Sequence, residues 1–160
     1  MTEHNGSCCF TGHRVIPTAH IQPLYEKLLE SVEVARRNGF RDFYTGGAVG
    51  FDRLAASAVL EVKEKYGDIR LHLLLPCLGQ EEKWSLEEQD AFHHECERAD
   101  EVQYLALTYY DGCMRARNQA LVDVADMCFA YVTNPRSGAG QTMRMAKEKG
   151  ITVLNLADLI

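Results

Sequence analysis

The chain has 160 residues, of which 46% are hydrophobic and 25% charged, and this composition predicts a single globular domain over residues 1–160. The formal net charge of -6 disfavours non-specific nucleic-acid binding, which requires a basic face, but is compatible with a small anion in a local pocket. The six cysteines form no CxxC pair, and no apolar stretch reaches membrane-spanning length. We therefore expect no zinc site, no disulfide framework and no membrane association. Residues 1–7 are polar and unlike a signal peptide, which favours a cytoplasmic location.

Short apolar runs alternate with helical periodicities along the whole chain. In chain order, the expected elements are strand 7–10, helix 19–37, strand 40–44, a helix from Leu54 to near Tyr66, strand 69–75, helix 85–99, strand 101–107, helix 114–124, strand 127–132, helix 141–149 and strand 151–154. Ser85 and Glu88 have the spacing of a capping box at the start of the third helix. The alternation predicts an α/β protein with a Rossmann-like, doubly wound, mainly parallel sheet and helices on both faces.

A glycine-rich turn, residues 45–52 (TGGAVGFD), connects the second predicted strand to the helix that follows it. Gly46, Gly47 and Gly50 permit a sharp bend and remove the Cβ atoms that would hold a ligand away from the backbone. The first amides of the next helix, at the positive end of its dipole, suit a phosphate or carboxylate. For this segment taken alone, the alternative is a tight turn that needs glycine only for its dihedral angles.

In a doubly wound sheet, ligands bind beyond the carboxyl ends of the strands, near the point where the strand order reverses. Four segments are expected at this edge: residues 11–14, 45–52, 112–118 and 135–142. Besides glycines, they carry the hydroxyls of Thr11, Thr45, Ser137 and Thr142 and the cations of Arg14, Arg115, Arg117 and Arg136. Because arginine binds phosphate through a bidentate fork, these cations on an acidic protein favour a phosphorylated small molecule. The alternative is that the arginines pair with neighbouring carboxylates.

Other features carry weaker signals. Neither GxGxxG nor GxxxxGK[ST] occurs, so the dinucleotide and Walker-type fingerprints are absent. His93, His94 and Glu97 are expected to form a helix surface rather than a metal site, and Cys9 is expected to lie in the core. The acidic segment 79–100 is expected to be a solvated face, with a protein-interaction scaffold as an alternative function.

Several motifs, taken together and in order, carry a family likeness. They are CFTGHR (residues 9–14), TGGAVGFD (45–52), the segment 76–84, Arg117-Asn118 with Val122-Asp123, and the segment 137–142. This set resembles the SLOG superfamily, and most of all its bacterial branch typified by YpsA-like proteins, first described as a domain of unknown function. The resemblance covers nearly the whole chain. It implies a Rossmann-like fold and a nucleotide or nucleotide-derived ligand.

A more distant similarity is to the LOG phosphoribohydrolases, which remove the base from a nucleoside monophosphate. Their glycine-rich strand-turn-helix is similar to residues 45–52, and their MxxRK segment is similar to residues 114–118. The second similarity implies that Arg117 faces the ligand. Their PGGxGTxxE motif matches residues 135–142 poorly, and Met145 stands nearest to the position of its acidic residue.

The leading prediction is a domain that binds a nucleotide or nucleotide-derived phosphorylated small molecule at the carboxyl edge of the sheet, as a sensor or regulatory module. The runner-up is a LOG-like nucleotide N-glycosidic hydrolase, with Arg117, Asp52 and Asp123 as candidate catalytic residues. Single-stranded DNA, suggested by DNA-processing relatives in the superfamily, is disfavoured by net charge and by the lack of an aromatic–basic stripe. No cofactor or metal ion is predicted, and homo-oligomer formation is left open. The predicted ligand-binding residues are Thr11, Gly12, His13, Arg14, Gly46, Gly47, Gly50, Asp52, Arg117, Asn118, Ser137, Gly138, Gly140 and Thr142.

Overall fold

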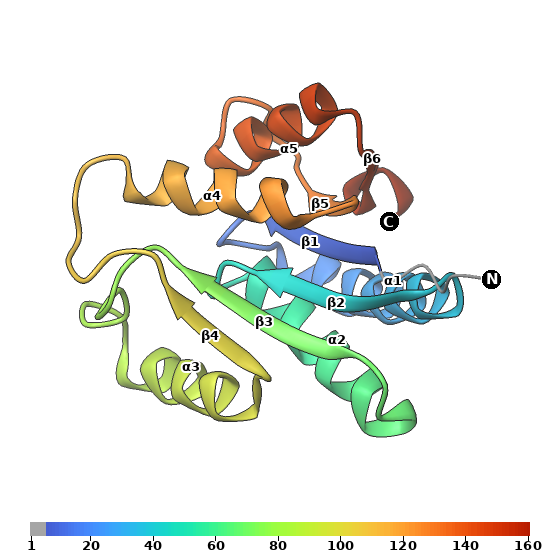
Figure 1. Ribbon diagram of the computed structural model, residues 1–160, viewed down its shortest axis with the longest axis horizontal. Coiled ribbons are helices and arrows are strands. Elements are labelled where there is room, and N and C mark those ends of the chain that lie inside the picture. The colour runs from blue at the N-terminus through green and yellow to red at the C-terminus, as the bar shows by residue number, and fades with distance from the viewer. Residues whose placement is uncertain (1–5) are drawn as a thin grey trace.

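Six parallel strands form the central layer of a computed structural model, which describes residues 6–160 (Figure 1). The strands are β1 (Gly6–Gly12), β2 (Phe40–Thr45), β3 (Arg70–Leu75), β4 (Glu101–Tyr104), β5 (Met127–Tyr131) and β6 (Thr152–Asn155). Their order across the sheet is β4-β3-β2-β1-β5-β6, and every pairing is parallel. The predicted doubly wound α/β fold is confirmed.

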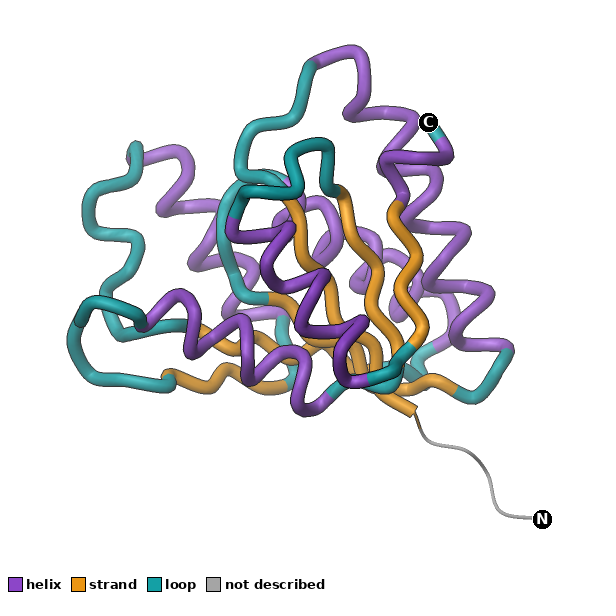
Figure 2. The backbone as a smooth tube through the Cα atoms, turned by 90° about the horizontal axis from the view of Figure 1, so that it is seen from above, coloured by secondary structure: helices purple, strands orange, loops and turns teal. Residues whose placement is uncertain are grey.

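Helices cover both faces of this sheet, as the two views in Figures 1 and 2 show. One face carries α1 (Thr18–Arg37), α2 (Phe51–Tyr66) and α3 (Leu86–Arg98), and the other carries α4 (Cys113–Val124) and α5 (Gly138–Lys149). The chain winds outward from β1 to β4 and then returns, so that β5 pairs with the free side of β1. The strand order therefore reverses between β1 and β5, and this is the topological switch point. No helix within residues 6–160 is long and apolar enough to cross a membrane.

Buried apolar side chains hold the helices to the sheet on both faces. On the α1–α2 face, the Phe10 ring lies 6.2 Å from that of Phe43 and 5.6 Å from that of Phe129, and all three are buried. On the α4–α5 face, Cys9 and Cys128 lie side by side on β1 and β5 and are fully buried. The cysteines are free thiols, and Cys9 is a core residue, as its apolar surroundings predict.

The structure differs from the prediction at α5, β4 and the final turn, and side-chain capping accounts for the first and the last of these differences. Helix α5 begins at Gly138, before the predicted start at 141, because the Ser137 Oγ accepts a hydrogen bond from the Gly140 amide at 3.0 Å. The fourth strand ends at Tyr104 instead of 107. A final 3₁₀ turn, η1 (Leu156–Leu159), was not predicted; the Asn155 side chain caps it.

The acidic segment before and within α3 is not uniformly solvated. The Ser85 Oγ accepts the Glu88 amide at 3.1 Å, as predicted, but the Glu88 carboxylate binds Arg53 on α2 at 2.8 Å instead of closing the capping box. Glu95 is 5% exposed and its Oε1 lies 3.5 Å from the Arg53 Nε. The expectation of a solvated face is wrong at Glu95, because this residue lies one turn after buried Phe92 and shares its inward-facing side.

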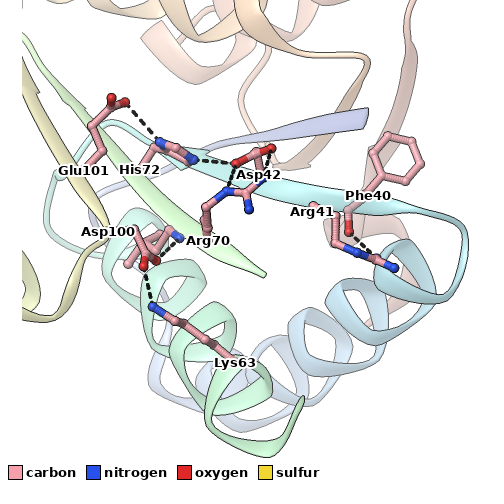
Figure 3. A network of polar contacts seen from close by, with 9 residues as sticks. Phe40, Arg41, Asp42, Lys63, Arg70, His72, Asp100 and Glu101 are labelled. Atoms are coloured by element: carbon pink, nitrogen blue, oxygen red, sulfur yellow. Dashed lines mark hydrogen bonds and ion pairs between the residues drawn. The ribbon is translucent and has the colours of Figure 1, made fainter. Parts of the chain in front are cut away.

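Charged side chains near the amino ends of β2, β3 and β4 pair with one another (Figure 3). His72 bridges Asp42, at 2.7 Å, and Glu101, at 3.0 Å, while Arg70 forms two hydrogen bonds to Asp42. Lys63 pairs with Asp100 on the other side of this network. Lys63, Arg70 and His72 therefore have carboxylate partners, whereas Arg41 at the same edge donates to the backbone carbonyls of Arg36 and Phe40.

Candidate functional site

A cavity of about 260 Å³ lies beyond the carboxyl end of β1, at the switch point with β5. Its walls come from the end of β1 and the loop after it, the turn before α2 and the start of that helix, α4, and the start of α5. The lining residues are Phe10, Thr11, Gly12, His13, Arg14, Ala48, Asp52, Met114, Arg117, Asn118, Leu121, Ser137, Gly138 and Ala139.

Arg117 reaches from α4 into this cavity and is 6% exposed. Its Nη1 donates to the Gly46 carbonyl at 2.6 Å and its Nε donates to the Asn118 Oδ1 at 2.9 Å. Among residues 6–160, its Nη2 donates only to the Met114 sulfur, a weak acceptor at 3.8 Å. Burial lowers the pKa of Arg117, and the nearby carboxylate of Asp52 opposes this effect.

Asp52 occupies the first turn of α2, on the opposite wall, and is 7% exposed. Its Oδ2 accepts a hydrogen bond from the Ala48 amide at 3.2 Å. Burial raises the pKa of Asp52, against the lowering effects of Arg117 and of the Ala48 hydrogen bond. The cavity thus holds one buried carboxyl group and one buried guanidinium that act on each other through space.

The glycine-rich turn makes room for protein groups rather than for the cavity. A Cβ atom on Gly46 would overlap the Arg117 guanidinium, which approaches the backbone here to bind the Gly46 carbonyl. Gly50 has φ +80°, and a Cβ atom there would overlap the Arg14 carbonyl. This close approach brings the loop after β1 against the start of α2, where the Phe51 amide donates to the His13 carbonyl at 3.0 Å.

His13 joins the two loops that meet at the switch point. Its Nε2 accepts hydrogen bonds from the Thr133 amide at 2.8 Å and the Asn134 amide at 3.3 Å, and its ring lies edge-on to Tyr131. An acceptor Nε2 is unprotonated, and burial lowers the pKa of His13, so both effects favour the neutral ring. His13 therefore positions the cavity wall and carries no charge there.

The start of α5 presents backbone amides to the cavity. The Ser137 Oγ accepts from the Gly140 amide and donates to the Asn134 carbonyl at 2.7 Å, while the Thr142 hydroxyl donates to the Gly138 carbonyl at 3.0 Å. Within residues 6–160, no group accepts a hydrogen bond from the amide of Gly138 or Ala139, and both residues line the cavity. These amides stand at the positive end of a helix dipole.

A family model described as the YspA SLOG family matches residues 16–152. The chain belongs to this SLOG family. It is 27% identical over 130 residues to a UPF0398 protein of Bacillus cereus (strain B4264), a match that spans 79% of the chain and 68% of the relative. It is 38% identical over 66 residues to a UPF0398 protein of Brevibacillus brevis (strain 47), which spans 41% of the chain and 35% of that relative.

Three solved structures share the fold of this SLOG chain. DNA processing protein A from Helicobacter pylori, described by its single-stranded DNA binding mode, has a TM-score of 0.64 at 16% identity, over 92% of the chain and 63% of that protein. DNA processing protein A from Streptococcus pneumoniae has a TM-score of 0.67 at 17% identity, over 93% of the chain and 49% of that protein. The structural-genomics target TM1055 has a TM-score of 0.62 at 15% identity, over 92% of the chain and 72% of that protein. The SLOG chain thus spans less than two thirds of both DNA processing proteins.

The cavity at the switch point of this SLOG chain is lined by nine of the predicted ligand-binding residues. Thr11, Gly12, His13, Arg14, Asp52, Arg117, Asn118, Ser137 and Gly138 line it. The predicted residues that do not line it are Gly46, Gly47, Gly50, Gly140, Thr142 and Asp123. Sequence reasoning did not include Phe10, Ala48, Met114, Leu121 and Ala139 among the ligand-binding residues, because small or apolar side chains carry little chemical signal.

The remaining candidates of the SLOG chain lie elsewhere. Asp123 is exposed near the end of α4, where its carboxylate accepts from the Gln119 amide at 2.9 Å. Met145 packs beside the apolar cluster between α4 and α5. Arg115 and Arg136 are exposed and outside the cavity lining. Within the described chain, no cluster of His, Cys, Asp and Glu side chains could hold a metal ion, and His93 pairs with Glu81 instead.

Proposed function

We propose that this SLOG chain binds a nucleotide or nucleotide-derived phosphorylated small molecule in the cavity at the switch point. The observation that carries the proposal is that the two arginines lining this cavity, Arg14 and Arg117, have no carboxylate partner among the described residues. Within residues 6–160, no carboxylate oxygen lies within 4.0 Å of Arg14 or Arg117. By contrast, Lys63, Arg70 and His72, near the amino ends of the strands, are paired with carboxylates.

Both guanidinium groups end at the same weak acceptor. The Nη2 atoms of Arg14 and Arg117 contact the Met114 sulfur at 3.9 and 3.8 Å. A phosphate in the cavity would replace these contacts with charge-assisted hydrogen bonds, which are shorter and roughly twice as strong as neutral ones. Gly138 and Ala139 line the same cavity, and their amides, which have no acceptor within residues 6–160, would bind further phosphate oxygens.

Asp52 supports a nucleotide over a simple phosphate. A phosphate would repel this buried carboxylate, whereas the hydroxyls of a ribose would donate hydrogen bonds to it. In other Rossmann folds, an acidic residue near the switch point binds ribose hydroxyls in the same way. The cavity therefore suits a ligand that carries both a phosphate and a sugar.

Replacing Arg14 by alanine should weaken nucleotide binding without disturbing the fold, because this side chain is exposed and, within residues 6–160, hydrogen-bonds only the Met114 sulfur. The loss of a charge-assisted contact is worth about 1.5–3 kcal/mol, or roughly 10- to 150-fold in Kd. Calorimetry with AMP, GMP, CMP and UMP measures this effect. Arg115→Ala, an exposed arginine on α4 outside the cavity, is the matched control and should bind like the unchanged protein. Equal affinity for the nucleotides and their free nucleosides would refute the phosphate site.

A second candidate function is hydrolysis of the N-glycosidic bond of a nucleotide. The observation in its favour is Asp52, whose raised pKa makes it a potential proton donor in the cavity that holds Arg117. Against it, Met145 occupies the position nearest to the acidic residue of the LOG motif and lies outside the cavity lining.

We expect no release of free base when the protein is incubated with nucleoside monophosphates and modified-base analogues and the mixture is followed by chromatography. Rapid release that both Asp52→Asn and Arg14→Ala abolish would refute the binder and establish the hydrolase. Release that survives both substitutions would come from a contaminating enzyme.

A further inference from the structure

A second, larger cavity of about 590 Å³ opens between the loops that follow β3 and β4. In Figure 1 these loops, green and yellow to orange, project together beyond the sheet. The Leu78 amide donates to the Ala106 carbonyl at 3.0 Å, which ties one loop to the other. The walls include Gln80, Trp84, Leu107, Tyr109 and Met114. The volume lies within the range of small-molecule sites, about 300–1,000 Å³.

Trp84 forms a fixed aromatic wall of this second cavity. Its ring meets that of buried Phe92 edge-on, with centroids 5.4 Å apart. Its amide donates to the Glu81 carbonyl at 2.9 Å, and its carbonyl accepts from the Gln89 side chain at 3.0 Å. The indole is therefore held in place before any ligand arrives.

Tyr109 and Leu107 supply further apolar surface to this cavity and are 65% and 80% exposed. Exposed aromatic and apolar side chains around a concave site bind flat, partly apolar groups. Purine and pyrimidine rings of every kind stack on aromatic side chains, because each ring has a π-face. Gln80 and Thr108 add polar groups to the lining, which can bind the edge of a heterocycle.

Met114 joins the two cavities, because it lines both. Its sulfur touches the tips of Arg14 and Arg117 on the side of the first cavity. A ligand whose phosphate is bound by these arginines would extend past Met114 toward Trp84 and Tyr109. We propose, on the basis of the function proposed above, that the second cavity binds the heterocyclic base of the nucleotide.

The test compares AMP with ribose 5-phosphate, which has the sugar and phosphate but no base. Trp84 is the single tryptophan of the chain, so its fluorescence reports on this cavity alone. We expect AMP to quench the emission of Trp84 and ribose 5-phosphate to bind about tenfold more weakly without quenching.

The variant Tyr109→Ser should weaken AMP binding about tenfold and leave the affinity for ribose 5-phosphate unchanged. The matched control is Tyr110→Ser, since Tyr110 is its exposed neighbour and lines neither cavity. Both tyrosines are exposed, and circular dichroism of the two variants should show an unchanged fold.

Different failures are distinguishable. If AMP and ribose 5-phosphate bind equally well without quenching, the base site is wrong and the phosphate site stands. If neither binds by calorimetry, the proposed function and the base site both fall. If a single-stranded oligonucleotide quenches Trp84 and AMP does not, the cavity serves a polymer and the nucleotide proposal is overturned.

Discussion

Replacing Arg117 by alanine is expected to lower the free energy of unfolding by about 3 kcal/mol and to weaken nucleotide binding at least as much as Arg14→Ala does. Two losses cause the destabilisation. The Gly46 carbonyl loses its 2.6 Å donor in a buried site, and the buried Asp52 loses the cation that lowers its pKa. Denaturation in urea measures the change in the free energy of unfolding, and calorimetry with AMP measures the change in nucleotide affinity.

A double-mutant cycle with Asp52→Asn separates these contributions. Asparagine keeps a carbonyl oxygen for the Ala48 amide but carries no charge, so Arg117→Ala should cost less in this background. We expect a coupling energy of about 1–2 kcal/mol, because proton uptake by Asp52 limits the cost of the single variant. Strictly additive costs would show that Asp52 and Arg117 do not interact. Arg115→Ala, one exposed arginine two residues earlier on α4, should have no effect on stability.

The parallel sheet and the edge at which the site is expected follow from general rules that a sequence can satisfy. Unbroken apolar runs such as 127–132 alternate with helical segments, which predicts parallel strands. Parallel strands place the loops after β1, β2, β4 and β5 at one edge of the sheet. Thr11, Arg14 and Arg117 lie at that edge for this reason. The order of the strands within the sheet was not predicted, because the alternation of strands and helices does not say which strands pair.

The use of each side chain at that edge depends on contacts that the sequence does not reveal. Position 46 requires glycine because Arg117, 71 residues later in the chain, lies where a Cβ atom would be. The hydroxyls of Ser137 and Thr142 bind the backbone of their own helix start. Asp123 follows Arg117 by six residues, about 600° of helix rotation, and so the two project from different sides of α4.

The burial of Glu95 had a signal that was outweighed by its acidic surroundings. It stands three residues after Phe92, at the spacing that puts both on one side of a helix. The many neighbouring carboxylates favoured a solvated face, yet periodicity proved the better guide at this position. Neither oxygen of Glu95 has a hydrogen-bond partner among the described residues.

Replacing Glu95 by glutamine is expected to stabilise the protein at alkaline pH. Burial, with a smaller contribution from Asp52, raises the pKa of Glu95 from its ordinary 4.5 to about 8, although Arg53 acts in the opposite direction. The folded state therefore binds a proton that the unfolded state has released between about pH 4.5 and pH 8. Stability from this group is present below that window and is lost as the pH rises through it.

Each pKa unit corresponds to about 1.4 kcal/mol, so the change at Glu95 sets an upper limit of about 4–5 kcal/mol for the loss above pH 8. Glutamine resembles the protonated acid and carries no charge at any pH. Urea denaturation of Glu95→Gln and the unchanged protein from pH 5 to pH 9 should show curves that meet near pH 5 and separate by a few kcal/mol at pH 9. Glu87→Gln, an exposed position in the first turn of the same helix, is the control and should leave the pH dependence unchanged. Parallel curves for Glu95→Gln and the unchanged protein would mean that Glu95 is ionised in the folded state throughout, with Arg53 supplying enough compensation to hold its charge.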